Sequence, residues 1–106
     1  MTNSELAKSS DDLAQLFSIL GDGTRMRILF LLRNAEVTVQ SLADDLDMTH
    51  SAVSHHLRLI RPYQLVKSRK KGRNVFYSLY DDCVWHLLEE GLAHLRHENV
   101  ELKVTE

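Results

Sequence analysis

The segment from position 81 to position 98 collects side chains that bind metal ions. It holds the chain's only cysteine, three of its six histidines and several carboxylates. Thiolates, imidazoles and carboxylates are the ligands that zinc takes in proteins. On a helix these side chains would form one stripe within about 80°, opposite the apolar residues. The stripe consists of Cys83, His86, Glu90, His94 and His97. The spacing predicts a helix with one face for a core and another for metal.

A single helix of this kind cannot bring both ends of the stripe to one ion. Cys83 and His94 are eleven residues apart, which is about 16 Å along a helix, whereas metal–ligand bonds measure about 2.0–2.3 Å. Two antiparallel copies in a symmetric dimer can place the Asp81–Cys83 end of one beside the His94–His97 end of the other. A weaker alternative is a site within one chain, because His86 and Glu90 are one helical turn apart.

The middle of the chain carries a concentrated positive charge. Residues 48–80 contain seven bases and no acid, although the net charge of the whole chain is −2. Such a cluster between acidic segments indicates a face that meets a polyanion. The alternative is a solvated cationic loop. His50, His55 and His56 lie in the same stretch and favour contact with phosphates and bases.

Apolar periodicity and turn residues predict the elements that position these side chains. Helices are expected over 11–20, 24–34, 38–48 and 49–60. Pro62 ends the fourth helix, and strands over 65–68 and 74–79 form a hairpin with Gly72 at the bend of a cationic tip. A last helix covers 81–98. The expected fold is therefore mainly α with a small β-hairpin, a helix-turn-helix followed by a wing.

This arrangement predicts a surface that reads double-stranded DNA. A recognition helix enters the major groove, where its early outward side chains reach the bases. A charged wing follows the backbone or enters the minor groove. The expected contacts come from His50, Ser51, Ser54, His55 and Arg58 on the helix, and from Arg69, Lys70, Lys71 and Arg73 in the wing. The alternative for the two serines is that they only cap and solvate the helix.

Three ordered motifs resemble the ArsR/SmtB family of metal-responsive bacterial repressors. They read "LGDGTRMRIL", "LADDLDMTHSAVSHHLRLI" and "LVKSRKKGRNVFYSL". The resemblance covers residues 10–98 and implies a homodimeric winged helix-turn-helix that occupies operator DNA until metal binds and relieves repression. One departure is Gly23, where the family often has proline.

The resemblance also implies the zinc-sensor type whose ligands lie on the C-terminal helix. Its pattern falls on Asp81, Cys83, His94 and His97. Cys83 stands where these sensors usually have histidine, and its softer thiolate keeps zinc while improving tolerance of cadmium; cobalt is a further candidate. The ring nitrogen of His94 that is free of metal would donate to a backbone carbonyl near Gln64 and couple the site to DNA. The cysteine pair of other members falls on Thr38 and Gln40, so that second site is expected to be absent.

Several classes of protein are disfavoured. No apolar run is long enough to span a membrane, the start of the chain lacks a secretory signal, so a cytoplasmic protein is expected, and no HExxH motif supports a zinc hydrolase. We expect a flexible N-terminus over 1–9, a winged helix-turn-helix domain with dimerisation helices at both ends over 10–98, and a flexible tail over 99–106. The alternative function is a winged-helix repressor that answers a redox or thiol signal through Cys83, or no metal.

Overall fold

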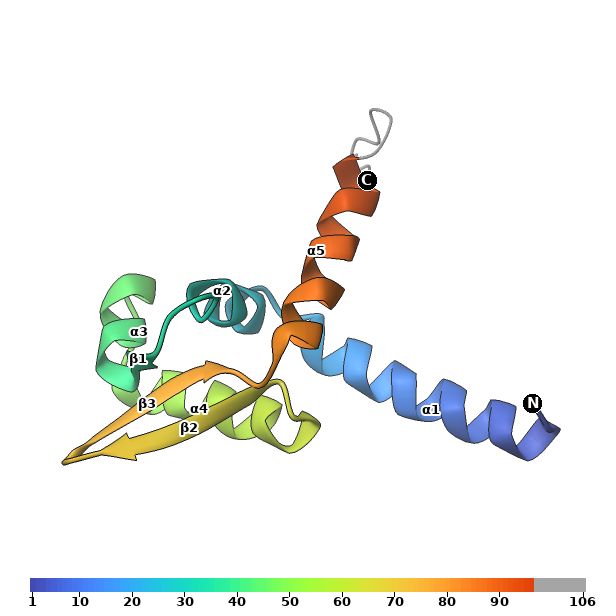
Figure 1. Ribbon diagram of the computed structural model, residues 1–106, viewed down its shortest axis with the longest axis horizontal. Helices are drawn as coiled ribbons and strands as arrows, with labels where there is room; N and C mark the ends of the chain where they lie inside the picture. The colour runs from blue at the N-terminus through green and yellow to red at the C-terminus, as the bar shows by residue number, and fades with distance from the viewer. Residues whose placement is uncertain (97–106) are drawn as a thin grey trace.

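The computed structural model describes residues 1–96 of the chain. Five α-helices and a small antiparallel sheet form a winged helix-turn-helix (Figure 1). In chain order the elements are α1 (Asn3–Leu20), α2 (Gly23–Leu31), β1 (Val37–Thr38), α3 (Val39–Leu46), α4 (His50–Ile60), the 3-10 turn η1 (Arg61–Tyr63), β2 (Val66–Lys71), β3 (Asn74–Leu79) and α5 (Asp82–Arg96). The expected class of fold, mainly α with a small β-hairpin, is confirmed.

The helix-turn-helix consists of α3 and α4, and each helix begins at a threonine cap. The Thr38 hydroxyl accepts a hydrogen bond from the Ser41 backbone N–H at 3.1 Å, and the Thr49 hydroxyl accepts one from Ala52 at 3.1 Å. Each bond satisfies a backbone donor that the first helical turn leaves free. Between the helices Asp47 adopts the left-handed conformation, with φ of 53°, which ends α3 and turns the chain sharply.

The wing is longer than its sequence pattern indicates, and it has a third strand. β2 continues through Lys71, which pairs with Asn74, so Gly72 and Arg73 alone form the turn. Gly72 has φ of 63°, a conformation that favours glycine at the first position of a two-residue hairpin turn. β1 pairs with β3 from the opposite side, which gives the strand order β1-β3-β2. The predicted strand over 65–68 was therefore too short.

One hydrophobic core holds the helix-turn-helix, the base of the wing and the start of α5 together. Its most deeply buried members are Ile28, Leu29, Leu32, Leu42, Val53, Ile60 and Val66. Val84 and Leu88, one turn apart on α5, are each 6 % exposed and join the same cluster. The first two turns of α5 are thus fixed to the body, and there the apolar side of the helix faces the core as expected. Further along the same side, Leu95 is 40 % exposed and lies outside the core.

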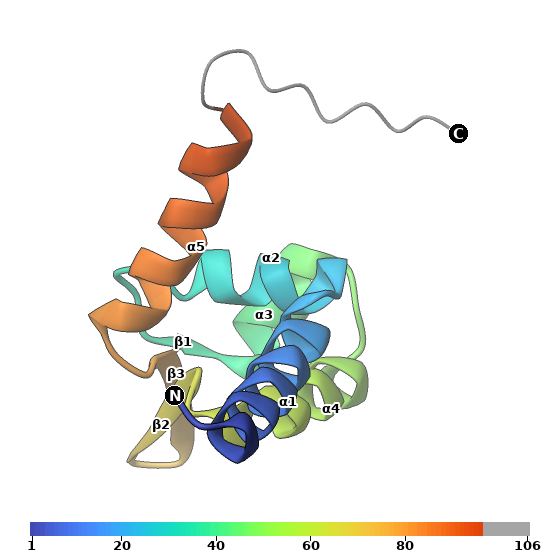
Figure 2. The same ribbon diagram turned by 90° about the vertical axis from the view of Figure 1, so that its right-hand side faces the viewer.

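The two terminal helices project from this body (Figures 1 and 2). α1 begins at Asn3, well before the expected position 11, because Thr2 and Glu5 form a reciprocal capping box. Most of α1 is exposed, and Leu13 and Phe17 are each 51 % exposed. Exposed apolar side chains along a helix indicate a surface that a partner covers. The flexibility predicted for residues 1–9 stays a prediction, and the tail over 99–106 lies outside the described residues.

Candidate DNA-binding surface and metal site

The start of α4 and the inner face of the wing enclose an open groove. α4 contributes His50 and Ser54 to its walls, and the wing contributes Arg73, Val75 and Tyr77. Among the predicted contacts, His50, Ser51, His55 and Arg58 are exposed and Ser54 is half-buried. Because Val53, Leu57 and Ile60 face the core, the polar side of α4 is turned outward, as a recognition helix requires.

A second, smaller groove continues along α4 towards η1. Its walls include Ser54, Arg58, Arg61 and Tyr77, so the two grooves share Ser54 and Tyr77 and follow one side of the recognition helix. Sequence reasoning missed several side chains that line these grooves. Gln40 and Asn74 line the first one, Arg61 lines the second, and Tyr77 lines both. Arg61 was visible only as part of the cationic run, whereas the other three reach the grooves through folding.

The cations of the wing do not all point to the same side. Successive residues of a strand face opposite sides, and residues in register on neighbouring strands share a side. Lys70 is in register with Val75, which lines the groove beside α4. Arg69 and Lys71 therefore lie on the opposite face. There the Arg69 guanidinium donates two hydrogen bonds to the Glu36 carboxylate, at 2.9 and 2.8 Å.

The predicted metal ligands lie at the two ends of α5. Asp81 precedes the helix, and its Oδ1 accepts a hydrogen bond from the Val84 backbone N–H at 3.3 Å. Cys83 is exposed on the first turn with a free thiol. His94 is exposed near the far end, and His97 lies outside the described residues. Within residues 1–96, no three His, Cys, Asp or Glu side chains gather closely enough to hold a metal ion.

The three described donors, Asp81, Cys83 and His94, therefore do not converge within one protomer, as the length of α5 predicts. Its chemistry nevertheless suits zinc, which takes oxygen, sulfur and nitrogen donors with tetrahedral geometry. Asp81 is already part of the helix cap, so only its second carboxylate oxygen is free of the Val84 contact. Exposure of Cys83 and His94 leaves both side chains accessible to ligands from a second copy.

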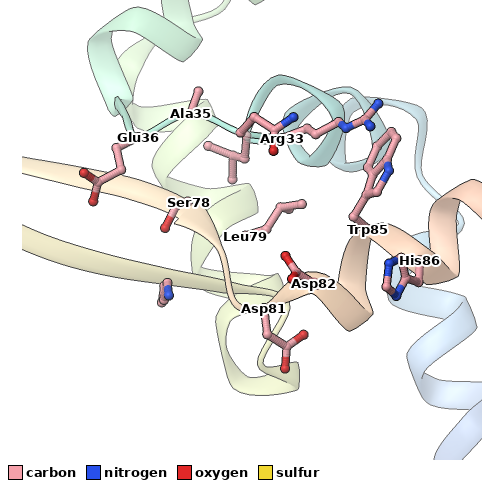
Figure 3. Close-up of a pocket in the computed structure, with 12 residues that line it drawn as sticks. Arg33, Ala35, Glu36, Ser78, Leu79, Asp81, Asp82, Trp85 and His86 are labelled. Carbon is pink, nitrogen blue, oxygen red and sulfur yellow. The ribbon is translucent and has the colours of Figure 1, made fainter.

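A cleft lies beside the start of α5, between that helix, the end of α2 and the outer face of the wing (Figure 3). Asp82 lines it from the first turn of α5, Asp81 from the residue before that helix, and Lys67 and Ser78 from the wing. Arg33 and Trp85 also line the cleft, and the Arg33 guanidinium lies over the Trp85 ring, 4.0 Å from the ring centroid. The residues around Cys83 thus contact both the wing and α2.

An apolar groove runs between α1, α2 and the outer half of α5. Its walls include Phe17, Leu20, Met26, Phe30, Leu87, Leu88, Leu92 and Leu95, with Glu90, Gly91 and His94 among them. His94 therefore borders an apolar groove formed with the terminal helices. Gln64, the predicted coupling partner, lies elsewhere, at the end of η1, with a left-handed backbone of φ 56°. The contact between His94 and the Gln64 region stays a prediction.

A recognition helix, a basic wing and a helix-turn-helix together define a DNA-binding transcriptional regulator of the winged helix class. The family model described as "Bacterial regulatory protein, arsR family" matches residues 22–68, which span α2 to the first part of β2. The chain is 42% identical over 87 residues to the "Transcriptional repressor SmtB homolog" of Synechocystis, covering 82% of this chain and 66% of that protein. It is 37% identical over 94 residues to the "Cadmium resistance transcriptional regulatory protein CadC homolog" of Staphylococcus aureus, covering 87% of this chain and 78% of that protein.

The chain belongs to the arsR family of bacterial regulatory proteins. A solved structure agrees with this assignment. The homodimeric winged helix-turn-helix DNA-binding domain of Mb0332 from Mycobacterium bovis superposes with a TM-score of 0.79 at 25% identity, over 97% of each chain. Members of this family are transcriptional regulators and not enzymes. The chain spans about two thirds of the length of the Synechocystis relative. No helix within the described residues is long and apolar enough to cross a membrane.

Proposed function

We propose that this protein is a homodimeric, metal-responsive repressor whose metal-free form binds operator DNA and whose zinc-bound form releases it. The observation that carries the proposal is the position of the ligand-type side chains. They lie at both ends of α5, Cys83 at the attached end and His94 beside the apolar groove. The similarity to a cadmium resistance regulatory protein of Staphylococcus aureus supports a metal as the signal, and cadmium and cobalt are the alternatives to zinc.

The second protomer would cover the apolar groove of the first. The groove is lined mainly by apolar side chains, Phe17 among them, and Leu13 lies exposed one turn before Phe17 on α1. Burial of such a surface is favourable by about 25 cal/mol for each Å² removed from water. An antiparallel pair of α5 helices would then place Asp81 and Cys83 of one protomer beside His94 and His97 of the partner, and symmetry would give two equal sites.

DNA binding would use the grooves between α4 and the wing in each protomer. His50, Ser51, Ser54, His55 and Arg58 would meet the major groove, while Arg69, Lys70, Lys71 and Arg73 would follow the phosphates. The coupling would depend on dimer geometry, since two recognition helices must match adjacent half-sites. Fixing the two α5 helices to each other changes that geometry or its mobility, and by linkage DNA must weaken metal binding by the same factor.

The test uses the full chain and a labelled duplex selected from random sequences by the metal-free protein. Cobalt titration should give a tetrahedral spectrum with a sulfur charge-transfer band at one ion per chain. Saturating zinc should weaken duplex binding by about tenfold or more, in the range of ordinary allosteric coupling. A duplex affinity unchanged by saturating zinc, cadmium or cobalt would overturn the metal response.

The second candidate is a repressor that senses oxidants or thiols through Cys83, which the exposed thiol favours. Substituting both His94→Gln and His97→Gln separates the two candidates. A metal sensor loses its response to zinc in this variant, whereas a thiol sensor still releases DNA after treatment with an oxidant.

A further inference from the structure

Within residues 1–96, Glu36 and Arg69 form the only side-chain hydrogen bonds that join positions far apart in the sequence. All other side-chain hydrogen bonds within residues 1–96 join positions at most four apart, whereas this pair spans 33 positions. The guanidinium nitrogens Nε and Nη2 each donate to a different carboxylate oxygen, at 2.9 and 2.8 Å. A two-pronged pair of this kind fixes the orientation of both planar groups.

The pair joins the two outer strands of the wing across the central one. Arg69 is in register with Phe76 on β3, which is in register with Thr38 on β1. Glu36 lies just before β1 and reaches across β3 to β2. β1 has only two residues, so its backbone pairing alone holds the outer strand weakly. The side-chain pair therefore strengthens the attachment of the wing to the segment that leads into the helix-turn-helix.

The same contact pairs the positive charge of Arg69 with the negative charge of Glu36. Lys67 and Lys71 share its face of the sheet, and both also attract the Glu36 carboxylate. The hydrogen bonds from Arg69 are the main reason that the pKa of Glu36 lies below its usual value. Lys70 lies on the other face, towards the groove beside α4, and Arg73 lines that groove directly. Neighbouring cations of the wing thus have different roles. Arg69 pairs with Glu36, whereas Lys70 and Arg73 face the groove beside α4.

We infer that Arg69 is a positioning residue, which holds the wing to β1 through Glu36, and that it makes no phosphate contact. The inference rests on the proposed DNA-binding surface and changes one member of it. Lys70, Lys71 and Arg73 then carry the phosphate contacts of the wing. If the hydrogen bonds between Arg69 and Glu36 are lost, the wing becomes more mobile relative to α4. The phosphate contacts of the wing then form at a higher entropic cost.

The experiment measures binding to a labelled random-sequence duplex as a function of salt concentration. Each phosphate contact contributes about 0.9 to the slope of log affinity against log salt. The variants are R69Q, the charge swap E36R/R69E, and K70Q and R73Q as matched controls. Thermal unfolding followed by circular dichroism verifies that each variant is folded before its binding is compared.

R69Q should weaken binding by about threefold at every salt concentration, with the slope of the wild type. E36R/R69E restores the ion pair with opposite polarity and should recover affinity to within about twofold. K70Q and R73Q should each lower the slope by about 0.9, because each removes one cation that binds a phosphate. A slope reduced in R69Q, or a swap that binds no better than R69Q, overturns the inference. If the salt dependence of binding is unchanged in both K70Q and R73Q, the proposed DNA-binding surface is wrong. The affinity of E36R/R69E relative to R69Q still tests the role of Arg69 in that case.

Discussion

The Arg33 guanidinium covers one face of the Trp85 ring, with its central carbon 4.0 Å from the ring centroid. The Phe30 ring meets the same indole edge to face, at 5.6 Å between centroids. Phe30 belongs to α2 and Trp85 to α5, and Arg33 follows the end of α2. These contacts, together with Val84 and Leu88 in the core, determine the angle at which α5 leaves the body of the protein.

R33Q should therefore destabilise the attachment of α5. A cation–π contact at an exposed position contributes about 0.5–1 kcal/mol, so the free energy of unfolding should fall by that amount. Trp85 is the chain's only tryptophan, and its fluorescence reports the change directly during urea denaturation. R27Q, which alters an exposed arginine within α2, is the control. Equal stability of R33Q and R27Q would contradict this role.

Phe17 should be required for self-association. Its side chain is half exposed on α1 and lines the apolar groove, so F17E places a charge in the surface that the second protomer would cover. We expect a monomer in sedimentation equilibrium at concentrations where the wild type is a dimer, together with loss of cobalt binding. Q15E adds the same charge to another exposed side of α1 and should remain dimeric. A dimeric F17E would place the interface elsewhere.

Thr49 should affect both stability and DNA binding, because its hydroxyl caps the recognition helix. T49A removes that bond, and loss of a helix N-cap costs about 1 kcal/mol. The midpoint of urea unfolding should fall accordingly, and duplex affinity should fall with it, since His50 and Ser51 lie in the first turn of α4. T49S retains the hydroxyl and should behave as the wild type in both measurements.

These caps explain why the helix-turn-helix could be predicted well from the sequence. Thr49 and Pro62 are local signals that bound α4, and the spacing of Val53, Leu57 and Ile60 identifies its buried side. β1 could not be found in this way, because its two residues pair with Phe76 and Tyr77, nearly forty positions later. The end of β2 was missed because it consists of consecutive cations, which lack the alternation of apolar and polar residues that identifies a strand.

The site could be predicted only in part for the same reason. The separation of Cys83 from His94 follows from helix geometry alone. In contrast, the contact between Glu36 and Arg69 depends on strand pairing, and the Thr2 capping box was overlooked because it lies at the end of the chain. Residues that line a groove from two elements, such as Gln40 and Tyr77, carry no local signal of their role.

Cys83 should determine the preference of the site among metals. C83S replaces a soft thiolate by a hard hydroxyl, so cadmium affinity should fall by a larger factor than zinc affinity, and the sulfur charge-transfer band of the cobalt form should vanish. H86Q is the matched control one turn away and should retain both. Loss of binding in H86Q with full binding in C83S would instead indicate the site formed by His86 and Glu90 within one chain.

The pair of Glu36 and Arg69 should contribute a pH-dependent part of the stability. The pKa of the Glu36 carboxyl is held below its usual value of 4.5, chiefly by the hydrogen bonds from Arg69. The folded state therefore favours the charged form, so this contribution is complete above pH 4.5 and is lost as the pH falls through the lower value of the folded protein. Unfolding of wild type and E36Q should differ near neutral pH and converge in acid. A constant difference would mean that the charge is unimportant.

β3 passes into α5 with only Tyr80 and Asp81 between them. The Tyr80 N–H donates a hydrogen bond to the Leu65 carbonyl at 3.0 Å, which restricts the motion of this connection. A rotation of α5 would therefore be transmitted to β3, the middle strand of the wing, through the backbone of these two residues. A displacement of the outer half of α5 would thus be transmitted to the wing through a junction only two residues from Cys83.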